Sequence, residues 1–207
     1  MSIVNVILTR DRLMNRLEVA RLCKLAYTEK TFEERGIEVL IKRNVVCFRG
    51  TDEIWPDVLT DIRFFPWYTR EIGITPSGFV KASKRLVNKV TSELYRRSVN
   101  RDKIILAGHS LGGAVALIVG ALMLRDETPP EKIITFGAPR TGALKNLRNS
   151  DVRVECFRQG KDIVPTVPPF MPRHRENFRI GEADSYIGDH SMDKYLSALA
   201  KEFDYDA

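Results

Sequence analysis

The sequence predicts an α/β protein with a mainly parallel central sheet and helices on both faces. Short apolar runs alternate along the chain with longer segments of helical character. The run at residues 104–106 is entirely apolar, as buried parallel strands are. Parallel strands need crossover connections of a dozen or more residues, and the intervening helices supply them. One domain over residues 1–207 is expected, because a chain of this length buries a sizeable core without cross-links.

Helices are expected where apolar residues recur at intervals of three and four positions. The first, at residues 11–29, carries a single apolar stripe, and a shorter amphipathic segment follows at 53–62. Further helices are expected at 77–97, after residue 110, and at 192–203. The helix after residue 110 is expected to end near Pro129, because proline cannot continue a helix.

Strands are expected where short apolar runs lie between turn-forming residues. The runs at 37–41 and 45–48 enclose a polar turn and should form a hairpin. Later strands are expected at 104–106, 132–136, 152–157 and 177–180, with a proline-rich loop at 165–172. Reactive groups in such a sheet belong at the carboxyl ends of strands. Thr51, Ser110 and Asp162 each follow an expected strand and are therefore candidates for a site.

The most specific motif follows the strand at 104–106. It reads G-H-S-L-G at residues 108–112, between an apolar strand and a helix, which is the nucleophile elbow of the α/β-hydrolase fold. Its small residues allow a strained turn that presents Ser110, while the backbone N–H of Leu111 and the helix dipole face a developing oxyanion. A glycine-rich turn around a buried serine is the alternative. We disfavour it because the pattern matches in the required strand and helix context.

A serine hydroxyl needs a base within hydrogen-bond reach. The chain contains three histidines: His109, His174 and His190. Hydrolases of this fold order the triad Ser, acid, His along the chain, so His190 is the expected base. His174, in the proline-rich loop, is the alternative, and the side chain of His109 should project away from the nucleophile.

The acid should orient the imidazole and stabilise its charged form. Asp162 is the expected acid, because it follows a strand and lies between Ser110 and His190 in the chain. Asp184 and Asp189 are the alternatives. Asp189 adjoins the expected base, and we expect it instead to cap the closing helix.

The second oxyanion donor, beside Leu111, is expected to be Thr51, through its backbone N–H and hydroxyl. An ordinary turn at a strand end is the alternative for that segment. The chain has no metal-ligand spacing, P-loop or dinucleotide motif, so neither a metal nor a cofactor is expected.

Residues 52–68 are expected to form a mobile apolar cover, or lid, that opens at a lipid surface. Ile54, Trp55, Val58 and Leu59 lie at helical spacing directly after Thr51. An apolar helix face there would shield a polar site in water. The alternative is that these side chains belong to the core.

Five blocks of this sequence resemble successive motifs of the class 3, or fungal-type, lipases, in the same order. They are Phe48–Thr51, Gly108–Ala114, Thr135–Gly142, Asp162–Pro165 and Asp189–His190. The resemblance implies an α/β-hydrolase with Ser110, Asp162 and His190 as its triad, Thr51 and Leu111 as its oxyanion hole, and a lid after Thr51. It also implies that Asp61 can hold the Thr51 hydroxyl. The chain departs from the family at Val58, where tryptophan is usual, and at Lys161, where asparagine is common.

The expected activity is hydrolysis of carboxylic esters of lipids through an acyl-enzyme, with a lipid or ester substrate and transient contact with a lipid surface. An esterase on small soluble esters, a phospholipase and a non-catalytic lipase-like module are the alternatives. A missing triad residue would have favoured the module. The net charge of +6 is spread along the chain, so nucleic acid is not an expected partner.

The expected location is cytoplasmic. No apolar run approaches the roughly 20 residues that span a bilayer, and the apolar N-terminal stretch lacks the basic region and cleavage site of a signal peptide. The three cysteines are expected to be buried free thiols. Secretion of a trimmed precursor is the alternative.

Overall fold

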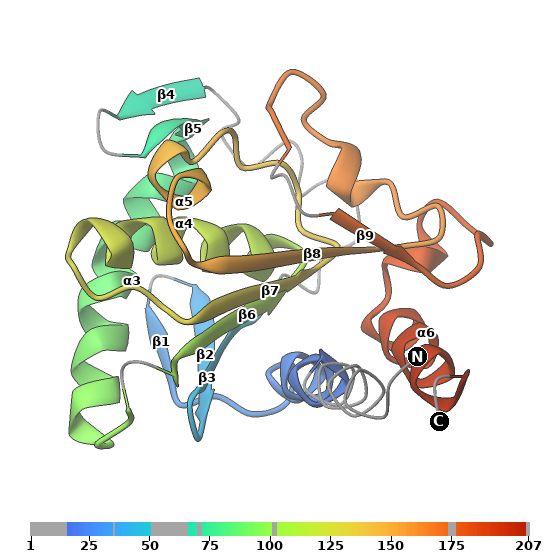
Figure 1. Cartoon of the computed structure of the whole chain (residues 1–207), viewed down its shortest axis with the longest axis horizontal. Coiled ribbons are helices and arrows are strands. Elements are labelled where there is room, and N and C mark those ends of the chain that lie inside the picture. The colour runs from blue at the N-terminus through green and yellow to red at the C-terminus, as the bar shows by residue number, and fades with distance from the viewer. Residues whose placement is uncertain are drawn as a thin grey trace, which may run out of the picture.

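The structure, a computed structural model, describes residues 16–34, 36–50, 66–69, 72–100, 103–173 and 177–205. A seven-stranded sheet in the order β1-β2-β3-β6-β7-β8-β9 forms its centre (Figure 1). The strands of this sheet are β1 (Phe32–Glu34), β2 (Ile37–Lys42), β3 (Val45–Phe48), β6 (Ile105–His109), β7 (Lys132–Phe136), β8 (Arg153–Gln159) and β9 (Asn177–Ile180). Strands β3, β6, β7, β8 and β9 run parallel, whereas β1 and β2 pair antiparallel at one edge. The expected mainly parallel sheet is confirmed.

Helices cover both faces of this sheet (Figure 1). Helical elements in the described part of the chain include α3 (Ser77–Arg96), α4 (Leu111–Arg125), α5 (Lys145–Arg148), α6 (Met192–Tyr205) and the short 3₁₀ turns η2 (Val164–Thr166) and η3 (Gly188–His190). Residues 16–25 form a further helix, which is the described part of the one expected at 11–29. Helix α4 ends at Arg125, ahead of Pro129, as the sequence predicts.

The sheet separates two apolar cores. One core lies under α3 and α4, and α4 is so enclosed that every residue from Gly112 to Met123 is buried. The other lies under α6 and helix 16–25, where Tyr195, Phe136 and Cys23 pack together. Because both faces are covered, the strands between them can be apolar on both sides.

Two short structures were not expected. Strand β1 extends the hairpin of β2 and β3, and β4 (Pro66–Thr69) pairs with β5 (Gly73–Pro76) as a separate two-stranded sheet. Both β4 and β5 span only four residues and carry a proline at one end, which weakens any strand pattern in the sequence.

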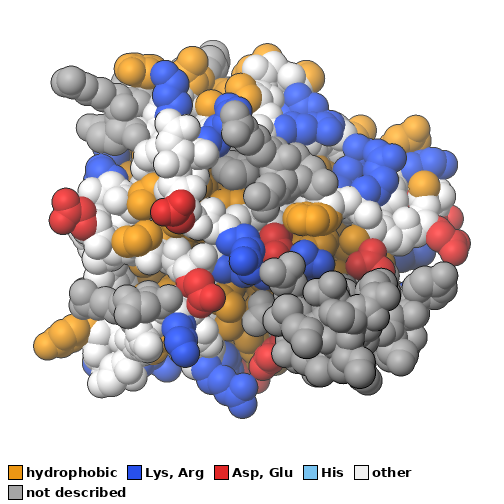
Figure 2. Space-filling model, in the orientation of Figure 1, with side chains coloured by type: hydrophobic (Ala, Val, Ile, Leu, Met, Phe, Trp, Pro, Cys, Tyr) orange, Lys and Arg blue, Asp and Glu red, His pale blue; other side chains and the backbone are white. Residues whose placement is uncertain are grey.

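The cysteines match their expected state in part. Cys23 and Cys47 are buried free thiols, whereas Cys156 is only half-buried. Lys and Arg side chains are spread over the surface, but on the face shown in Figure 2 they also gather over the segment between β8 and β9.

Candidate active site

Ser110 stands at the sharp turn between β6 and α4, as the motif predicts. Its backbone has φ 54° and ψ −129°, a conformation that costs a non-glycine residue on the order of 1–3 kcal/mol. The turn is possible because its neighbours are small: a Cβ atom on Gly112 would lie 2.0 Å from the carbonyl oxygen of Phe48. Leu111 opens α4, so its amide belongs to the first turn, whose N–H groups have no acceptor within the helix. An anion beside Ser110 could therefore accept a hydrogen bond there.

Three side chains from distant parts of the chain form one hydrogen-bonded series. His190 Nε2 lies 2.9 Å from Ser110 Oγ, and His190 Nδ1 lies 2.9 Å from Asp162 Oδ2. Ser110 follows β6, Asp162 follows β8, and His190 ends the 3₁₀ turn after β9. The structure thus brings together the three residues that the sequence predicts as a triad.

Asp162 is fully buried, and both of its carboxylate oxygens accept hydrogen bonds. The backbone N–H of Val164 donates to Oδ1 at 2.9 Å, and the Tyr195 hydroxyl donates to Oδ2 at 2.6 Å. Burial, together with the nearby Asp162 charge, raises the pKa of Tyr195 well above its ordinary value. Tyr195 therefore stays protonated and acts as a donor. This role was not predicted, because the sequence pattern indicates only that Tyr195 lies on the closing helix.

His109 lies beneath the base rather than beside the nucleophile. Its Nε2 is 2.7 Å from the backbone oxygen of His190, and its Nδ1 is 2.6 Å from the Tyr27 hydroxyl. Burial and the neighbouring His190 lower the pKa of His109 to about 3, so the ring is neutral. A carbonyl oxygen only accepts, so Nε2 carries the proton and Nδ1 accepts from Tyr27. This support for His190 was not predicted.

Gly137 closes the site from the end of β7. Its φ is +63°, and a Cβ atom there would lie 2.8 Å from Asp162 Oδ2 and 2.9 Å from His190 Nδ1. Gly137 belongs to one of the blocks that resemble the lipase family. That it makes room for Asp162 and His190 was not predicted.

The two alternative acids have other partners. The exposed Asp184 carboxylate pairs with Lys194 Nζ at 2.9 Å. Asp189 is buried, and its Oδ2 accepts the backbone N–H groups of Lys161 and Asp184 at 2.8 and 3.0 Å.

The expectation that Asp189 caps α6 is therefore wrong. Asp189 lies inside η3, ahead of the helix, so its carboxylate turns into the junction between two loops. Ser191 takes the capping place instead, because its Oγ accepts the Lys194 N–H at 3.3 Å.

Several expected site residues lie outside the described residues: Thr51, Ile54, Trp55, Val58, Leu59 and the alternative base His174. The described chain does reach the residue before Thr51. A Cβ atom on Gly50 would lie 3.1 Å from Ser110 Cβ, so the chain that leaves β3 passes beside the serine.

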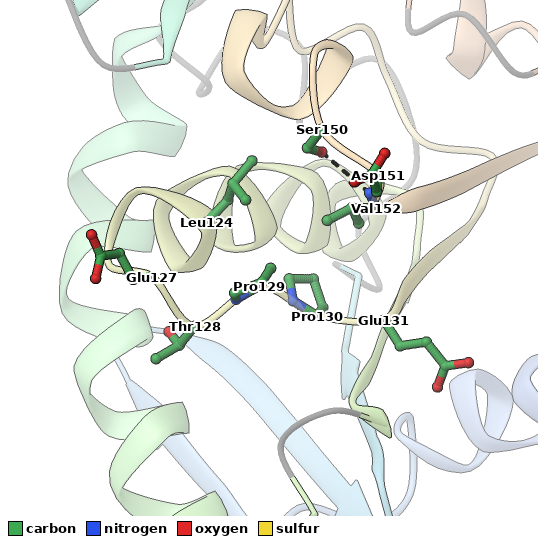
Figure 3. Close-up of a pocket in the computed structure, with 9 residues that line it drawn as sticks. All are labelled: Leu124, Glu127, Thr128, Pro129, Pro130, Glu131, Ser150, Asp151 and Val152. Atoms are coloured by element: carbon green, nitrogen blue, oxygen red, sulfur yellow. Dashed lines mark hydrogen bonds between the residues drawn. The ribbon is translucent and has the colours of Figure 1, made fainter.

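A separate hollow of about 650 Å³ lies near the amino-terminal ends of β7 and β8, away from the carboxyl ends of the strands that carry Ser110 and Asp162 (Figure 3). It is lined by residues 124, 127–131 and 150–152, around the end of α4 and the start of β8. Its serine, Ser150, donates to the backbone oxygen of Leu147 at 2.9 Å and accepts the Val152 N–H at 3.3 Å. Over the described ranges no three His, Cys, Asp or Glu side chains are grouped as a metal site requires.

Curated relatives of this chain are fungal lipases. A protein named secreted mono- and diacylglycerol lipase MDL3, from Malassezia globosa, is 29% identical over 153 residues, which are 65% of this chain and 50% of that protein. A lipase from Rhizopus oryzae is 32% identical over 135 residues, or 60% of this chain and 34% of that protein. The chain thus spans half or less of the length of these two relatives.

The relatives correct the expected location. Three of them, two from Malassezia globosa and one from Fusarium solani, are named secreted mono- and diacylglycerol lipases, which contradicts a cytoplasmic location. The free cysteines do not indicate the compartment, because Cys23 and Cys47 are buried in the core and a buried thiol reflects packing. Among the described helices, none combines the length and apolar character needed to span a bilayer.

Solved structures show the same fold. The lipase of Rhizopus microsporus var. chinensis superposes with a TM-score of 0.65 at 21% identity, over 90% of this chain and 78% of that one. The Lip2 lipase of Yarrowia lipolytica superposes with a TM-score of 0.62 at 19% identity, over 83% of this chain and 79% of that one. These likenesses establish the α/β-hydrolase fold. The family model for lipase (class 3) matches residues 45–171, more than half of the 207, and so the chain belongs to the class 3 lipase family.

Proposed function

We propose that this protein is a serine hydrolase that cleaves the carboxylic esters of acylglycerols. One observation carries the proposal: Ser110 Oγ, His190 and the buried Asp162 form a continuous series of 2.9 Å hydrogen bonds. Relatives named as mono- and diacylglycerol lipases support the substrate class. We further propose that residues 1–207 form one domain, which is supported by α6 and helix 16–25 packing on the same sheet.

In the first half of the reaction, Ser110 Oγ attacks the ester carbonyl carbon while His190 Nε2 takes the hydroxyl proton. Asp162 stabilises the imidazolium that forms, and it can do so while buried because Val164 and Tyr195 also donate to it. The Leu111 N–H donates to the oxyanion of the tetrahedral intermediate, with Thr51 as the expected second donor. The intermediate collapses as the alcohol leaves with the proton from His190.

In the second half, water replaces the alcohol. His190 takes a proton from the water as the oxygen attacks the acyl-enzyme carbonyl, and the fatty acid leaves as the proton returns to Ser110 Oγ. The lid at residues 52–68 stays a prediction, since that segment is largely outside the described residues.

The test is labelling and substitution of the nucleophile. A p-nitrophenyl phosphonate should label Ser110 alone, and Ser110→Ala should lower kcat for p-nitrophenyl butyrate by on the order of 10⁴- to 10⁶-fold with an unchanged melting temperature. Ser150→Ala is the matched control and should keep full activity, because that serine lies in the hollow at the amino-terminal ends of β7 and β8. Stoichiometric labelling elsewhere would overturn the assignment.

The base is tested by comparing His190→Ala with His174→Ala. We expect His190→Ala to lose activity to a similar degree as Ser110→Ala, and His174→Ala to remain active. The reverse pattern would make His174 the base.

A further inference from the structure

The loops that carry Asp162 and His190 present apolar side chains to solvent. Ile163, next to the acid, is 41% exposed, while Tyr186 and Ile187, ahead of the base, are 62% and 60% exposed. The Ile163 N–H donates to the Tyr186 backbone oxygen at 3.2 Å, so the two loops are joined at this point. Single exposed apolar residues are common on proteins, but these three lie together beside the triad.

A fourth exposed apolar side chain sits on the braced loop that follows Asp162 along the chain. Phe170 is 63% exposed, between Pro169 and Met171. The Arg140 guanidinium donates to the backbone oxygens of Pro169 and Met171 at 2.7 and 3.3 Å. The Arg140 backbone N–H also donates to the backbone oxygen of Val167 at 2.8 Å. Arg140 therefore holds the loop by hydrogen bonds both before and after Phe170 in the chain.

Positive charge surrounds these side chains. Arg158 and Arg179 are register partners on β8 and β9, so they project from the same face of the sheet. Arg173 ends the Phe170 loop, and repulsion from Arg173 and Arg179, after burial itself, lowers the pKa of Arg158. Lys161, ahead of Asp162, is exposed, and its ammonium lies 6.0 Å from the centre of the Tyr186 ring. Figure 2 shows the gathering of basic side chains over this segment, with hydrophobic ones beside them.

Carboxylates do not balance this charge within the described part of the chain. The acidic group that stabilises charged Arg158 is Asp162, which is buried and already hydrogen-bonded to His190 and Tyr195. Glu182 and Asp184 instead stabilise the charge of Lys194 on α6. The Nε atoms of Arg140 and Arg158 are buried and have no hydrogen-bond partner.

We propose that this basic face, formed by Lys161, Ile163, Phe170, Arg173, Arg179 and Tyr186, docks on a bilayer that contains anionic phospholipid. The apolar side chains enter the interface while the lysine and arginines contact the anionic head groups. Because the face adjoins Asp162, docking turns the active site toward the lipid. The inference rests on the proposed function for the lipid nature of the substrate. Nucleic acid fits less well, because aliphatic side chains such as Ile163 gain from burial in lipid and do not stack on bases.

The test measures binding separately from hydrolysis. The Ser110→Ala protein is sedimented with phosphatidylcholine vesicles, with and without 30% phosphatidylglycerol, at low and high salt. Binding should need the anionic lipid and weaken with salt. Lys161→Gln, Arg173→Gln and Arg179→Gln together should weaken it on the order of 100-fold, since each basic side chain near the membrane contributes roughly fivefold. Phe170→Ser should weaken it further.

The matched control removes the same charge elsewhere. The control variant combines Lys84→Gln, Arg85→Gln and Arg153→Gln. Lys84 and Arg85 are exposed residues of α3, and Arg153 begins β8, at the opposite end of that strand from Arg158. This control should reduce binding only a few-fold. An equal loss in both triple variants, equal binding to vesicles without phosphatidylglycerol, or tighter binding to a DNA duplex would overturn the proposal.

Hydrolysis of soluble p-nitrophenyl butyrate distinguishes this proposal from the proposed function. With Ser110 intact, the basic-face triple variant should keep its kcat/KM for that ester, because none of the three side chains touches the triad. The wild-type protein could instead fail to react with the phosphonate and fail to hydrolyse the ester, yet still bind anionic vesicles. That result would count against the proposed function and would leave the proposed docking surface supported.

Discussion

Gly137 shows how one missing side chain makes room for the chemistry. Its hydrogen occupies the place where a methyl group would meet Asp162 Oδ2 and His190 Nδ1. Two constraints act there together: the space and the positive φ. They can be separated, because Gly36 has a φ of +79° with nothing within 4 Å of its virtual Cβ.

We predict that Gly137→Ala lowers kcat/KM for a soluble ester on the order of 100-fold, because a displacement of about 1 Å within a reacting group has that effect. Gly36→Ala, the control, should reduce stability by about 1–2 kcal/mol through its backbone alone and leave kcat/KM unchanged. Ester kinetics and thermal unfolding of both variants provide the measurement. Equal activities in the two variants would show that Gly137 serves only the turn.

At the scale of an element, α6 links the core to the site. Tyr195, Ala198 and Leu199 bury one face of the helix under the sheet, and the hydroxyl of that same tyrosine reaches Asp162. The helix thus stabilises the fold and orients the acid through a single side chain.

Tyr195→Phe should keep the packing and remove the hydrogen bond. We predict a loss of about 1–2 kcal/mol in the free energy of unfolding, because the buried carboxylate loses a donor, and a decrease in kcat of roughly tenfold. Tyr95→Phe on α3 is the control, since that ring is 75% exposed. Urea unfolding and ester kinetics test both variants. An unchanged kcat in Tyr195→Phe would show that Tyr195 contributes only to packing.

At the scale of the whole molecule, His109 couples global stability to pH. Its pKa is about 3 in the folded protein, against about 6.5 for a free histidine. Between these values the unfolded chain binds a proton at this residue and the folded chain does not. The contribution of a neutral, buried His109 is therefore complete above pH 6.5 and is lost as the pH falls toward 3.

We predict that the stability difference between wild type and His109→Gln shrinks as the pH falls from 7 to 4.5, with a slope of up to about 1.4 kcal/mol per pH unit. Tyr27→Phe is the control, because it retains the titrating ring and should follow the wild-type slope. Urea unfolding at several pH values supplies the free energies. Parallel curves for wild type and His109→Gln would show that His109 does not carry the linkage.

Sequence reasoning reached the class of fold, the places of the main strands along the chain and the residues of the hydrogen-bonded series. These depend on local patterns, such as the strand–turn–helix around Ser110 and the chain order of Asp162 and His190. The residues that hold the series in place could not be predicted from local patterns. Tyr195 and His109 act through contacts between residues far apart in the chain, and a local pattern records neither partner. The prediction that Asp189 caps the closing helix was wrong because the three-residue turn that contains Asp189 places its carboxylate away from that helix.

The spacing of the series has a consequence for how the protein is made. Ser110 and His190 are 80 positions apart, and Tyr195, which holds the acid, comes later still. A chain emerging from the ribosome exposes Ser110 long before His190, the base in the proposed mechanism. The strained elbow is also stable only once β3, β6 and α4 have packed around it. In the proposed mechanism, reactivity therefore depends on contacts between segments far apart in the chain, and a half-made or misfolded chain that lacks these contacts would carry a serine with no more reactivity than an ordinary alcohol.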